Sequence, residues 1–515
     1  MPKALRSGVL LTAAAFAAGS PAVFEGGAAS PRNHIDELVF ARLRGLGLQP
    51  ANLCSDAVFL RRAYLDTTGT LPTAAEAAAF LADDSPGKRS ALIDRLLASE
   101  EFADYQAMKW SDVLRVKAEF PINLWPNAAQ AYHHWLRAQI AGNVPYDRFA
   151  RDLLTASGSN FRAPPVNFYR ALQNRDPEAV ARAVALAFMG VRAEKWPKER
   201  LAGMAAFFSR IQYKPTGEWK EEIVQLAPAT TPLAARFPDG TEARIAPGQD
   251  PREVFAAWLA TAKNPWFARA IANRVWSWLL GRGIVEDPDD FRDDNPAENP
   301  ELLAYLAGEL TGAGFDPRHL YRLILNSSTY QLSPVPRDAH ADSAAHFASY
   351  PLRRLDAEVL IDALCRVTGT GETYSSAIPE PFTWMPDDQR AVALPDGSIT
   401  SSFLELFGRP PRDTGLEAER NNRITDAQRL HLLNSTHVLR KIEQGPAIQE
   451  LIRTNSRNPQ EMVRQLYLTV LSRYPTAEEW QAVAQHSRTA TAKGRAAIVD
   501  LAWALINSTE FLYRH

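Results

Sequence analysis

The chain has 515 residues, 46% hydrophobic and 23% charged, close to an average soluble globular protein. This composition excludes a fully disordered chain, a collagen-like fibre and a protein with many membrane spans. The 57 basic and 59 acidic residues give a net charge of −2, so no global positive field indicates nucleic acid as a partner. At roughly 100–200 residues per domain, the length allows two to four domains.

The first residues have the layout of a targeting segment. Lys3 and Arg6 precede a short apolar run from Gly8 to Ala18, and small residues follow it. This order is typical of a secretory signal peptide, and the run is too short to span a bilayer comfortably. We therefore predict a signal peptide over residues 1–22, cleaved between about Ala18 and Ser30. The mature protein is expected to be secreted or periplasmic, with no membrane span.

Most of the remaining chain predicts helices. Thr73-Ala74-Ala75-Glu76 is a capping-box pattern before an apolar run, and Ser85-Pro86-Gly87 breaks the chain after it. Thr476 and Glu479 repeat the capping box. The stretch from Ala256 to Leu280 predicts further helix, divided near Asn264-Pro265.

The middle of the chain predicts a small amount of strand. Glu221 to Leu226 has a strand-like pattern, and Phe237-Pro238-Asp239-Gly240 is a turn signal. We predict a mainly α protein with two helical domains, 33–213 and 251–515, joined by a small β-containing connector over 214–250. A second loop-rich region runs from Gly369 to Ser402, either as an ordinary connection or as a loop that carries function.

A short polar phrase recurs after apolar helical runs, at Asn326-Ser327-Ser328, Asn434-Ser435-Thr436 and Asn507-Ser508-Thr509. Asn, Ser and Thr side chains can cap one helix end and start the next segment. The same phrases match the glycosylation acceptor pattern, but the helix-end role explains them equally well.

Known catalytic and cofactor motifs are absent from the sequence. There is no His-Glu-x-x-His pair, no Gly-x-Ser-x-Gly elbow, no phosphate-binding P-loop and no Cys-x-x-Cys-His. Cys54 and Cys365 alone cannot form a disulfide scaffold or hold a cysteine-based metal site. The adjacent His133 and His134 would point roughly 100° apart on a helix, so they are poor partners for one metal ion. We expect no metal and no cofactor.

Two polar clusters are dense enough to consider as sites. Acidic residues are dense in the stretch from Glu286 to Asn295. The stretch either binds a hard cation such as calcium or forms a solvated surface. Arginines and carboxylates gather between Arg353 and Asp362 and again between Arg409 and Arg420. Arginine pairs with carboxylates in an internal network, or with sulfate and phosphate groups of a ligand. The candidate binding residues are Arg353, Arg354, Asp356, Glu358, Glu419, Arg420 and His431, with His431 as a candidate proton carrier.

Several longer motifs carry a family resemblance. In the first half they are Phe59-Leu60-Arg61-Arg62-Ala63-Tyr64-Leu65-Asp66 with Thr67-Thr68-Gly69-Thr70-Leu71-Pro72, Pro145-Tyr146-Asp147-Arg148-Phe149 and Phe188-Met189-Gly190-Val191-Arg192. In the second half they include Asn273-Arg274-Val275-Trp276, Tyr350-Pro351-Leu352-Arg353-Arg354 and Leu430-His431-Leu432-Leu433-Asn434. Over nearly the whole mature chain, the sequence resembles planctomycete secreted proteins with paired domains of unknown function 1549 and 1553. The resemblance implies an exported protein, often encoded beside a secreted hydrolase-like partner, and no known reaction.

The chain departs from that family pattern at two places where many members carry cysteine or histidine. Ala193-Glu194-Lys195-Trp196-Pro197 replaces one such segment, and Leu416 and Ala418 replace the cysteines of the other. Joint loss of soft ligands suggests that both segments once built one metal centre. We therefore predict that Ala193–Arg200 and Pro411–Arg420 are spatial neighbours, with Lys195, Lys198 and Arg200 available to pair with Glu417 and Glu419.

Two classes of function remain open at this point. The first is a non-catalytic binding or scaffold component of an exported complex, in complex-polysaccharide breakdown on one hypothesis. The second is a hydrolase that uses carboxylates in an arginine-rich cleft, since carboxylate-based glycosidases have no local sequence signature. The expected partners are a secreted hydrolase-like protein and an anionic or glycan ligand, and no nucleic acid is expected.

Overall fold

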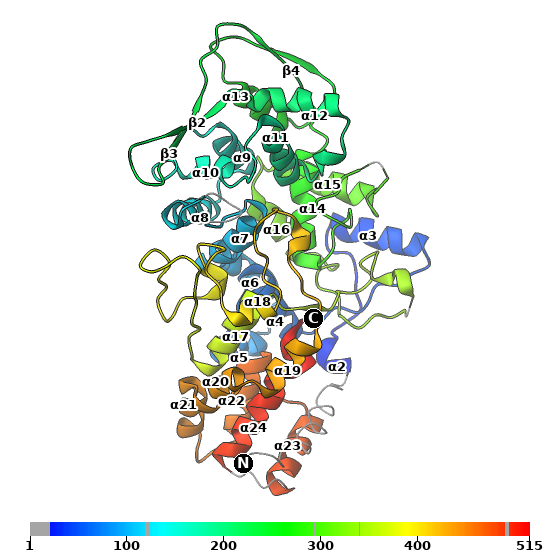
Figure 1. Ribbon diagram of the computed structural model, residues 1–515. Coiled ribbons are helices and arrows are strands. Elements are labelled where there is room, and N and C mark those ends of the chain that lie inside the picture. Colours follow the sequence, from blue (N-terminus) through cyan, green and yellow to red (C-terminus); the bar gives the residue numbers. More distant parts are fainter. Residues whose placement is uncertain (1–20, 119–123, 293, 339, 490–493) are drawn as a thin grey trace.

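The structure is a computed structural model that describes residues 21–118, 124–292, 294–338, 340–489 and 494–515. It is mainly helical with three small antiparallel sheets, so the predicted fold class is confirmed. The predicted signal peptide lies outside the described residues, apart from the start of helix α2. Figure 1 shows an elongated molecule with the β-hairpins at one end, helices α21–α24 at the other, and the C-terminus near the middle.

The first half of the chain supplies helices that surround one apolar core. They are α2 (Pro21–Phe24), α3 (His34–Gly45), α4 (Asp56–Thr67), α5 (Ala74–Ala82), α6 (Lys88–Leu97), α7 (Glu100–Val113), α8 (Pro126–Ala141), α9 (Tyr146–Thr155), α10 (Asn167–Arg170), α11 (Pro177–Val184) and α12 (Lys198–Ala205).

The second half continues with helices on both sides of the molecule's middle. They are α13 (Pro251–Leu259), α14 (Phe267–Leu280), α15 (Pro300–Gly312), α16 (Pro317–Leu325), α17 (Ala357–Thr368), α18 (Ser402–Leu406), α19 (Asp426–Asn434), α20 (Thr436–Gln444), α21 (Pro446–Thr454), α22 (Pro459–Leu471), α23 (Ala477–Thr489), α24 (Arg495–Ile506) and α25 (Thr509–Leu512).

The helix ends follow local sequence chemistry. Thr73 caps α5 and exchanges hydrogen bonds with Glu76, while Thr476 and Glu479 do the same before α23. The predicted division near Asn264-Pro265 separates α13 from α14, and the Asn264 side chain accepts hydrogen bonds from the first backbone N–H groups of α14. These predicted elements are confirmed, because cap formation depends on residues close in sequence.

The recurring polar phrase also marks helix ends, as predicted. Helix α19 ends at its asparagine, α16 and α24 end one residue before it, and α20 and α25 begin directly after its serines. Ser435 caps α20 by accepting a hydrogen bond from Val438, and Ser508 caps α25 by accepting one from Phe511. The phrase is therefore a helix–helix junction at two of its three occurrences, those of Asn434 and Asn507.

The connector contains the predicted strands. Strand β3 (Glu222–Leu226) lies between β2 (Ile211–Pro215) and β1 (Gly158–Ser159) in an antiparallel sheet. Strands β4 (Leu233–Arg236) and β5 (Glu242–Ile245) form a hairpin whose turn begins at Phe237, where a turn was predicted.

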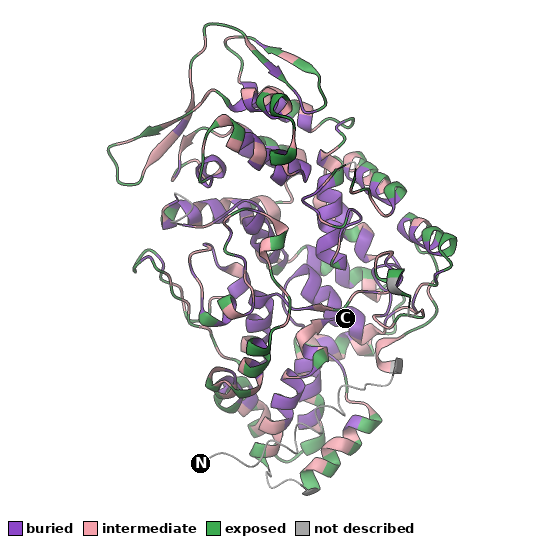
Figure 2. Cartoon of the chain, turned by 45° about the vertical axis from the view of Figure 1, so that its right-hand side comes forward, coloured by how far each residue is buried: buried purple, intermediate pink, exposed green. Residues whose placement is uncertain are grey.

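The apolar packing forms two cores. Figure 2 shows buried residues along the length of the molecule. The first extends through Ile35 to Tyr350, with Ile378 and Leu468, and it includes connector residues such as Val224 and Ile245. The second extends through Leu355 to Phe511 and takes in Leu65, Leu71, Tyr105 and Met108. The packing therefore changes near residue 350, so the connector is not where one core gives way to the other. The predicted domain limits stay a prediction.

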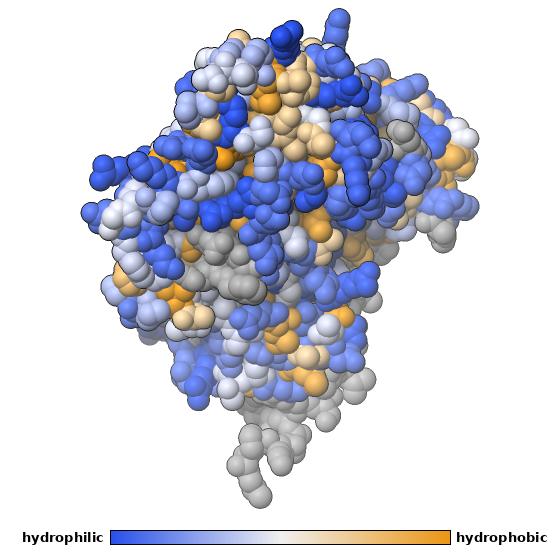
Figure 3. All heavy atoms as spheres, turned by 45° about the horizontal axis from the view of Figure 1, so that its top comes forward, coloured by the Kyte–Doolittle hydropathy of each residue, from blue (hydrophilic) through white to orange (hydrophobic). Residues whose placement is uncertain are grey.

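The short segment that crosses between the cores positions the candidate site. Strand β6 (Arg353–Arg354) pairs with β7 (Tyr513–Arg514), with Arg353 opposite Arg514. The face drawn in Figure 3 is mainly hydrophilic, with hydrophobic residues in small separate patches. Among the described residues, no helix combines the length and the apolar character needed to cross a membrane.

Candidate functional site

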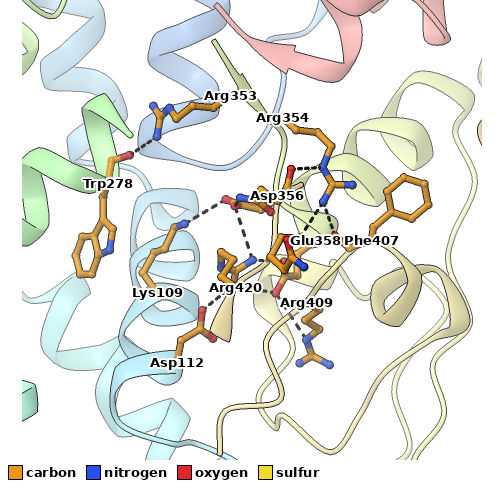
Figure 4. A network of polar contacts seen from close by, with 12 residues as sticks. Lys109, Asp112, Trp278, Arg353, Arg354, Asp356, Glu358, Phe407, Arg409 and Arg420 are labelled. Atoms are coloured by element: carbon orange, nitrogen blue, oxygen red, sulfur yellow. Dashed lines mark hydrogen bonds and ion pairs between the residues drawn. The ribbon is translucent and has the colours of Figure 1, made fainter. Parts of the chain in front are cut away.

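Asp356 is the centre of a buried polar network between the two cores (Figure 4). It occupies the cap position of α17 in an extended conformation, but its side chain makes no capping hydrogen bond. The carboxylate instead accepts hydrogen bonds from Lys109 at 3.1 Å, Arg514 at 2.9 Å and Asn422 at 2.7 Å. Burial alone would raise the pKa of Asp356, but the positive charges of Lys109, Arg514 and Arg420 hold that pKa well below its ordinary value.

Arg420 extends the network to two more carboxylates. Its guanidinium donates to both oxygens of Glu358, at 2.7 and 3.1 Å, and to Asp112 at 2.7 Å. Burial would lower the pKa of Arg420, but Glu358, Asp112 and Asp356 hold it well above its ordinary value. Arg412 also donates to Asp112 at 2.9 Å, and Arg409 lies 3.7 Å from Glu358. Both carboxylates therefore have more than one cationic neighbour.

Arg353 and Arg354 join the network to surrounding backbone. Arg353 donates to the carbonyl oxygens of Trp278 and Leu279, and to Asp66 at 3.2 Å. Arg354 donates to the carbonyl oxygens of Phe407, Asn421 and Asn422 and to the side chain of Gln428. These bonds give both arginines a structural role in addition to any role in binding.

Of the seven predicted residues, the structure brings together Arg353, Arg354, Asp356, Glu358 and Arg420. Glu419 lies outside these contacts: its carboxylate accepts hydrogen bonds from the backbone of Asp413 and Thr414, so it shapes a loop. His431 packs against the rings of Phe403, Phe407 and His437. Burial, followed by the nearby His437, lowers the pKa of His431.

A cavity of about 550 Å³ opens beside this network. Its charged lining residues are the cations Lys109, Arg282, Arg353, Arg354, Arg420, Arg423 and Arg514 and the acids Glu286, Asp287, Asp356 and Glu417. Burial raises the pKa of Glu417, which therefore holds its proton more readily than an exposed glutamate. Seven cationic and four acidic side chains therefore line the cavity, and Asp66, Asp112 and Glu358 pair with three of the cations, Arg353, Arg420 and Arg514.

Sequence reasoning missed several members of this site. Asp66 lies in a quoted family motif, but nothing local to Lys109, Asp112 or Arg514 points to a role. Their partners are far away in the sequence: Arg514 donates to Asp356 across 158 residues, and Asp112 accepts from Arg420 across 308. Only the tertiary fold assembles them.

The two segments that lack the family's soft ligands are neighbours, as predicted. Glu194 of the first segment lines a cavity of about 290 Å³ together with Asp413, Thr414 and Leu416 of the second. The predicted ion pairs across it are wrong. Lys195 lies 3.7 Å from Asp290, and Arg200 donates to the carbonyl oxygen of Pro238 and stacks over Trp196. Lys195 therefore pairs with an acid of the 286–295 stretch in place of Glu417 or Glu419.

The same acidic stretch is engaged in ion pairs. Asp289 pairs with buried Arg274 at 2.7 Å, and Asp287 pairs with Arg192. Asp293 lies outside the described residues. Within the part of the chain that the structure describes, no three His, Cys, Asp or Glu side chains are grouped so that they could hold a metal ion. His133 is buried on α8, and burial lowers its pKa to about 3.

Comparison with protein families assigns both halves of the chain. The family model described as protein of unknown function DUF1549 (PSCyt2) matches residues 34–211, and that described as protein of unknown function DUF1553 (PSD1) matches residues 251–487. This chain belongs to the family that pairs these two domains. Neither the curated proteins nor the solved structures contain a match to it.

The network joins the two family domains. Asp66, Lys109 and Asp112 come from the DUF1549 segment, whereas Asp356, Glu358 and Arg420 come from the DUF1553 segment. Arg514 lies beyond the residues that the DUF1553 model matches. A site at this junction depends on both domains being present and correctly placed.

Proposed function

We propose that this protein is an exported, non-catalytic binding component that holds an anionic group in the cavity between its two cores. The observation that carries the proposal is the excess of cationic over acidic side chains in the cavity lining. A cleft whose lining carries more groups of one sign of charge attracts ligands of the opposite sign. Sulfate and carboxylate groups of acidic polysaccharides have the required chemistry.

Arg282 and Arg423 are the residues best placed to meet such a group. Arg282 lies 3.5 Å from the exposed Glu286, and its buried Nε–H has no hydrogen-bond partner among the described residues. Arg423 is exposed and lines the same cavity. The deeper Arg420 and Arg514 already donate to buried carboxylates. They therefore contribute to the electrostatic potential in the cavity more than they contact the ligand.

Binding of inorganic sulfate, measured by titration calorimetry, tests this proposal. Wild-type protein is expected to bind sulfate, and the R282A/R423A variant to lose most of that affinity because two guanidinium groups are removed. Arg429→Ala is the matched control, since Arg429 is an exposed arginine of α19 that pairs only loosely with Asp426, at 3.5 Å. Equal sulfate binding by all three proteins, or none by the wild type, would contradict the proposal.

The resemblance to exported proteins supports a role beside a secreted hydrolase-like partner. In that arrangement this chain would hold an acidic polysaccharide while the partner cleaves it. Affinity purification from the native host should recover the partner together with this chain. Recovery of the chain alone from the exported fraction would contradict the arrangement.

A hydrolase is the second candidate, and one observation favours it. Glu417 has a raised pKa and Asp356 a lowered one, and both line the same cavity. Glycosidases use one protonated and one ionised carboxyl group in this way. Release of reducing ends from an acidic polysaccharide by wild-type protein, lost in Glu417→Gln and retained in Arg429→Ala, would select this function over simple binding.

A further inference from the structure

Three aromatic side chains from distant parts of the sequence meet at the surface. Trp219 lies in the turn between β2 and β3, Trp125 directly precedes α8, and Phe382 belongs to the loop over 369–402. The Trp125 and Trp219 ring centroids are 4.4 Å apart at an interplanar angle of 75°, and those of Trp125 and Phe382 are 5.2 Å apart at 66°. We call these three residues the aromatic platform.

Two of the three platform rings, Trp219 and Phe382, are exposed to solvent, and Trp125 is half-buried. Trp219 is 65% exposed and Phe382 is 36% exposed, and Trp384, two residues along the same loop, is 60% exposed. Trp219, Phe382 and Trp384 are three of the seven large hydrophobic side chains that are exposed in the described residues. Tryptophan is highly buried on average, so a group of exposed aromatic rings at one place indicates a binding surface.

The turn that carries Trp219 is held in a fixed shape. The Glu221 carboxylate accepts hydrogen bonds from Ser159 at 2.5 Å and from Thr216 at 2.9 Å. The Thr216 hydroxyl in turn accepts one from the backbone of Glu218, at 3.1 Å. Lys220 adopts a left-handed φ of 59°, a conformation that the neighbouring bonds stabilise. Trp219 is therefore presented by an ordered turn.

The other edge of the platform is also tied to the fold. Gln130 of α8 donates a hydrogen bond to the Phe382 carbonyl oxygen at 2.9 Å, which fixes the long loop against the helix. The Lys220 ammonium lies 5.5 Å from the ring centroid of Trp125 and 5.7 Å from that of Trp219. The three rings, which meet edge to face, and the polar groups beside them thus form one small surface.

This surface fits a sugar ring. One face of a pyranose presents several C–H bonds that pack on an aromatic ring, while its hydroxyl groups at the edge bind polar neighbours such as Gln130 and Lys220. We propose that the aromatic platform binds pyranose rings of a polysaccharide. The platform deepens the proposed function by giving the ligand a chemical class, but its observations are independent of the arginine-lined cavity.

Affinity electrophoresis of the full chain in gels that contain polysaccharide tests the inference. A neutral β-glucan and an acidic polygalacturonate are the two probes, since both present pyranose rings and only the second carries charge. Trp219→Ala should weaken binding by about tenfold, equivalent to about 1.4 kcal/mol. Trp219→Phe keeps an aromatic face and should retain most of the affinity. Leu430→Ala, which removes a 58% exposed side chain on α19, is the matched control and should bind as the wild type does.

The outcomes separate this inference from the proposed function. Retardation by either polysaccharide that is lost in Trp219→Ala and kept in R282A/R423A supports the platform, whatever the sulfate titration shows. Absence of retardation of the wild type by both probes, or equal retardation of Trp219→Ala, overturns it. Protection of Trp219 by a protein partner in place of either polysaccharide also overturns it. Matching thermal midpoints for wild type and Trp219→Ala would exclude unfolding as the cause of lost binding, and Trp219→Phe provides the comparison if the midpoints differ.

Discussion

Two of the molecule's arginine–carboxylate networks differ in one instructive way. In the second core, Arg473 donates to both oxygens of Glu479 and of Glu510, at 2.7–2.8 Å. Between the cores, several arginines share Asp356, Glu358 and Asp112 beside a cavity lined by more cationic than acidic side chains. Ion pairing by itself therefore does not mark a binding site in this fold. A cationic surplus beside an open cavity does distinguish one network from the other.

The comparison predicts different costs for removing the central arginine. Arg473→Ala leaves Glu479 and Glu510 buried without their shared cation and should destabilise the protein by about 3–5 kcal/mol. Arg420→Ala should cost less, because Arg409 and Arg412 remain near Glu358 and Asp112. Urea unfolding of both variants measures the difference. A larger loss for Arg420→Ala would show that the site network has no reserve of positive charge.

A second prediction compares two carboxyl groups of the same helix region. Asp356 is surrounded by cations, whereas Asp362 has Arg390 at 3.7 Å and two backbone N–H groups. Burial raises the pKa of Asp362 to about 6, above the value of about 3.9 in the unfolded chain. The folded state therefore binds the proton more tightly, and its stability should fall as pH rises from about 4 to about 6.

Asp362→Asn isolates that pH dependence, since asparagine does not titrate. Relative to this variant, wild-type protein should lose up to about 3 kcal/mol of stability between pH 4 and pH 6, and the difference should be constant above that window. Urea unfolding across this pH range measures it. Parallel stability curves for the two proteins would contradict the raised pKa.

A third prediction tests how tightly the first core packs on the network. Gly281 ends α14 with a left-handed φ of 80°, and a Cβ there would lie 2.2 Å from Cδ of Arg353. Gly281→Ala should cost about 2–3 kcal/mol, from backbone strain and displacement of Arg353. Gly314→Ala is the control, because its φ is 66° and a Cβ would have no atom within 4 Å. It should cost only about 1 kcal/mol in thermal or urea unfolding. Equal losses of stability in the two variants would show that backbone strain alone, without displacement of Arg353, explains the cost.

The smallest effect is expected at a surface pair with good geometry. Arg453 donates to both oxygens of Glu450, at 2.5 and 2.8 Å, but both side chains are exposed to solvent. Arg453→Ala should leave the unfolding midpoint unchanged, because water and salt screen such pairs. A clear loss of stability would show that a short distance between the charged groups decides the strength of an ion pair even when both side chains are exposed.

The local elements were predictable because their causes lie within a few residues. Capping boxes at Thr73 and Thr476, the break at Asn264-Pro265 and the helix junctions at Ser435 and Ser508 all depend on neighbouring side chains. The mainly helical class and the strands near Glu222 followed from periodicity and turn signals.

The site was only partly predictable because its members come from both halves of the chain. The clustering of Arg353, Arg354, Asp356 and Glu358 in sequence survives as a cluster in space, since one strand and one helix start carry them. His431 was predicted in the site but does not contact the network, because α19 directs its ring toward Phe403 and Phe407. Lys109, Asp112 and Arg514 had no local signal, and packing of the two cores decided their place.

Strand β7 and the residues just before it contact helices from the start of the chain, and this has a consequence for the order of folding. Arg514 reaches Tyr105 across 409 residues, and Arg61 reaches the carbonyl oxygen of Phe511 across 450. Contacts of such sequence separation require the closure of very long loops, which slows their formation. The network around Asp356 should therefore form late, after most of each core has packed. Until then its carboxylates stay exposed to water.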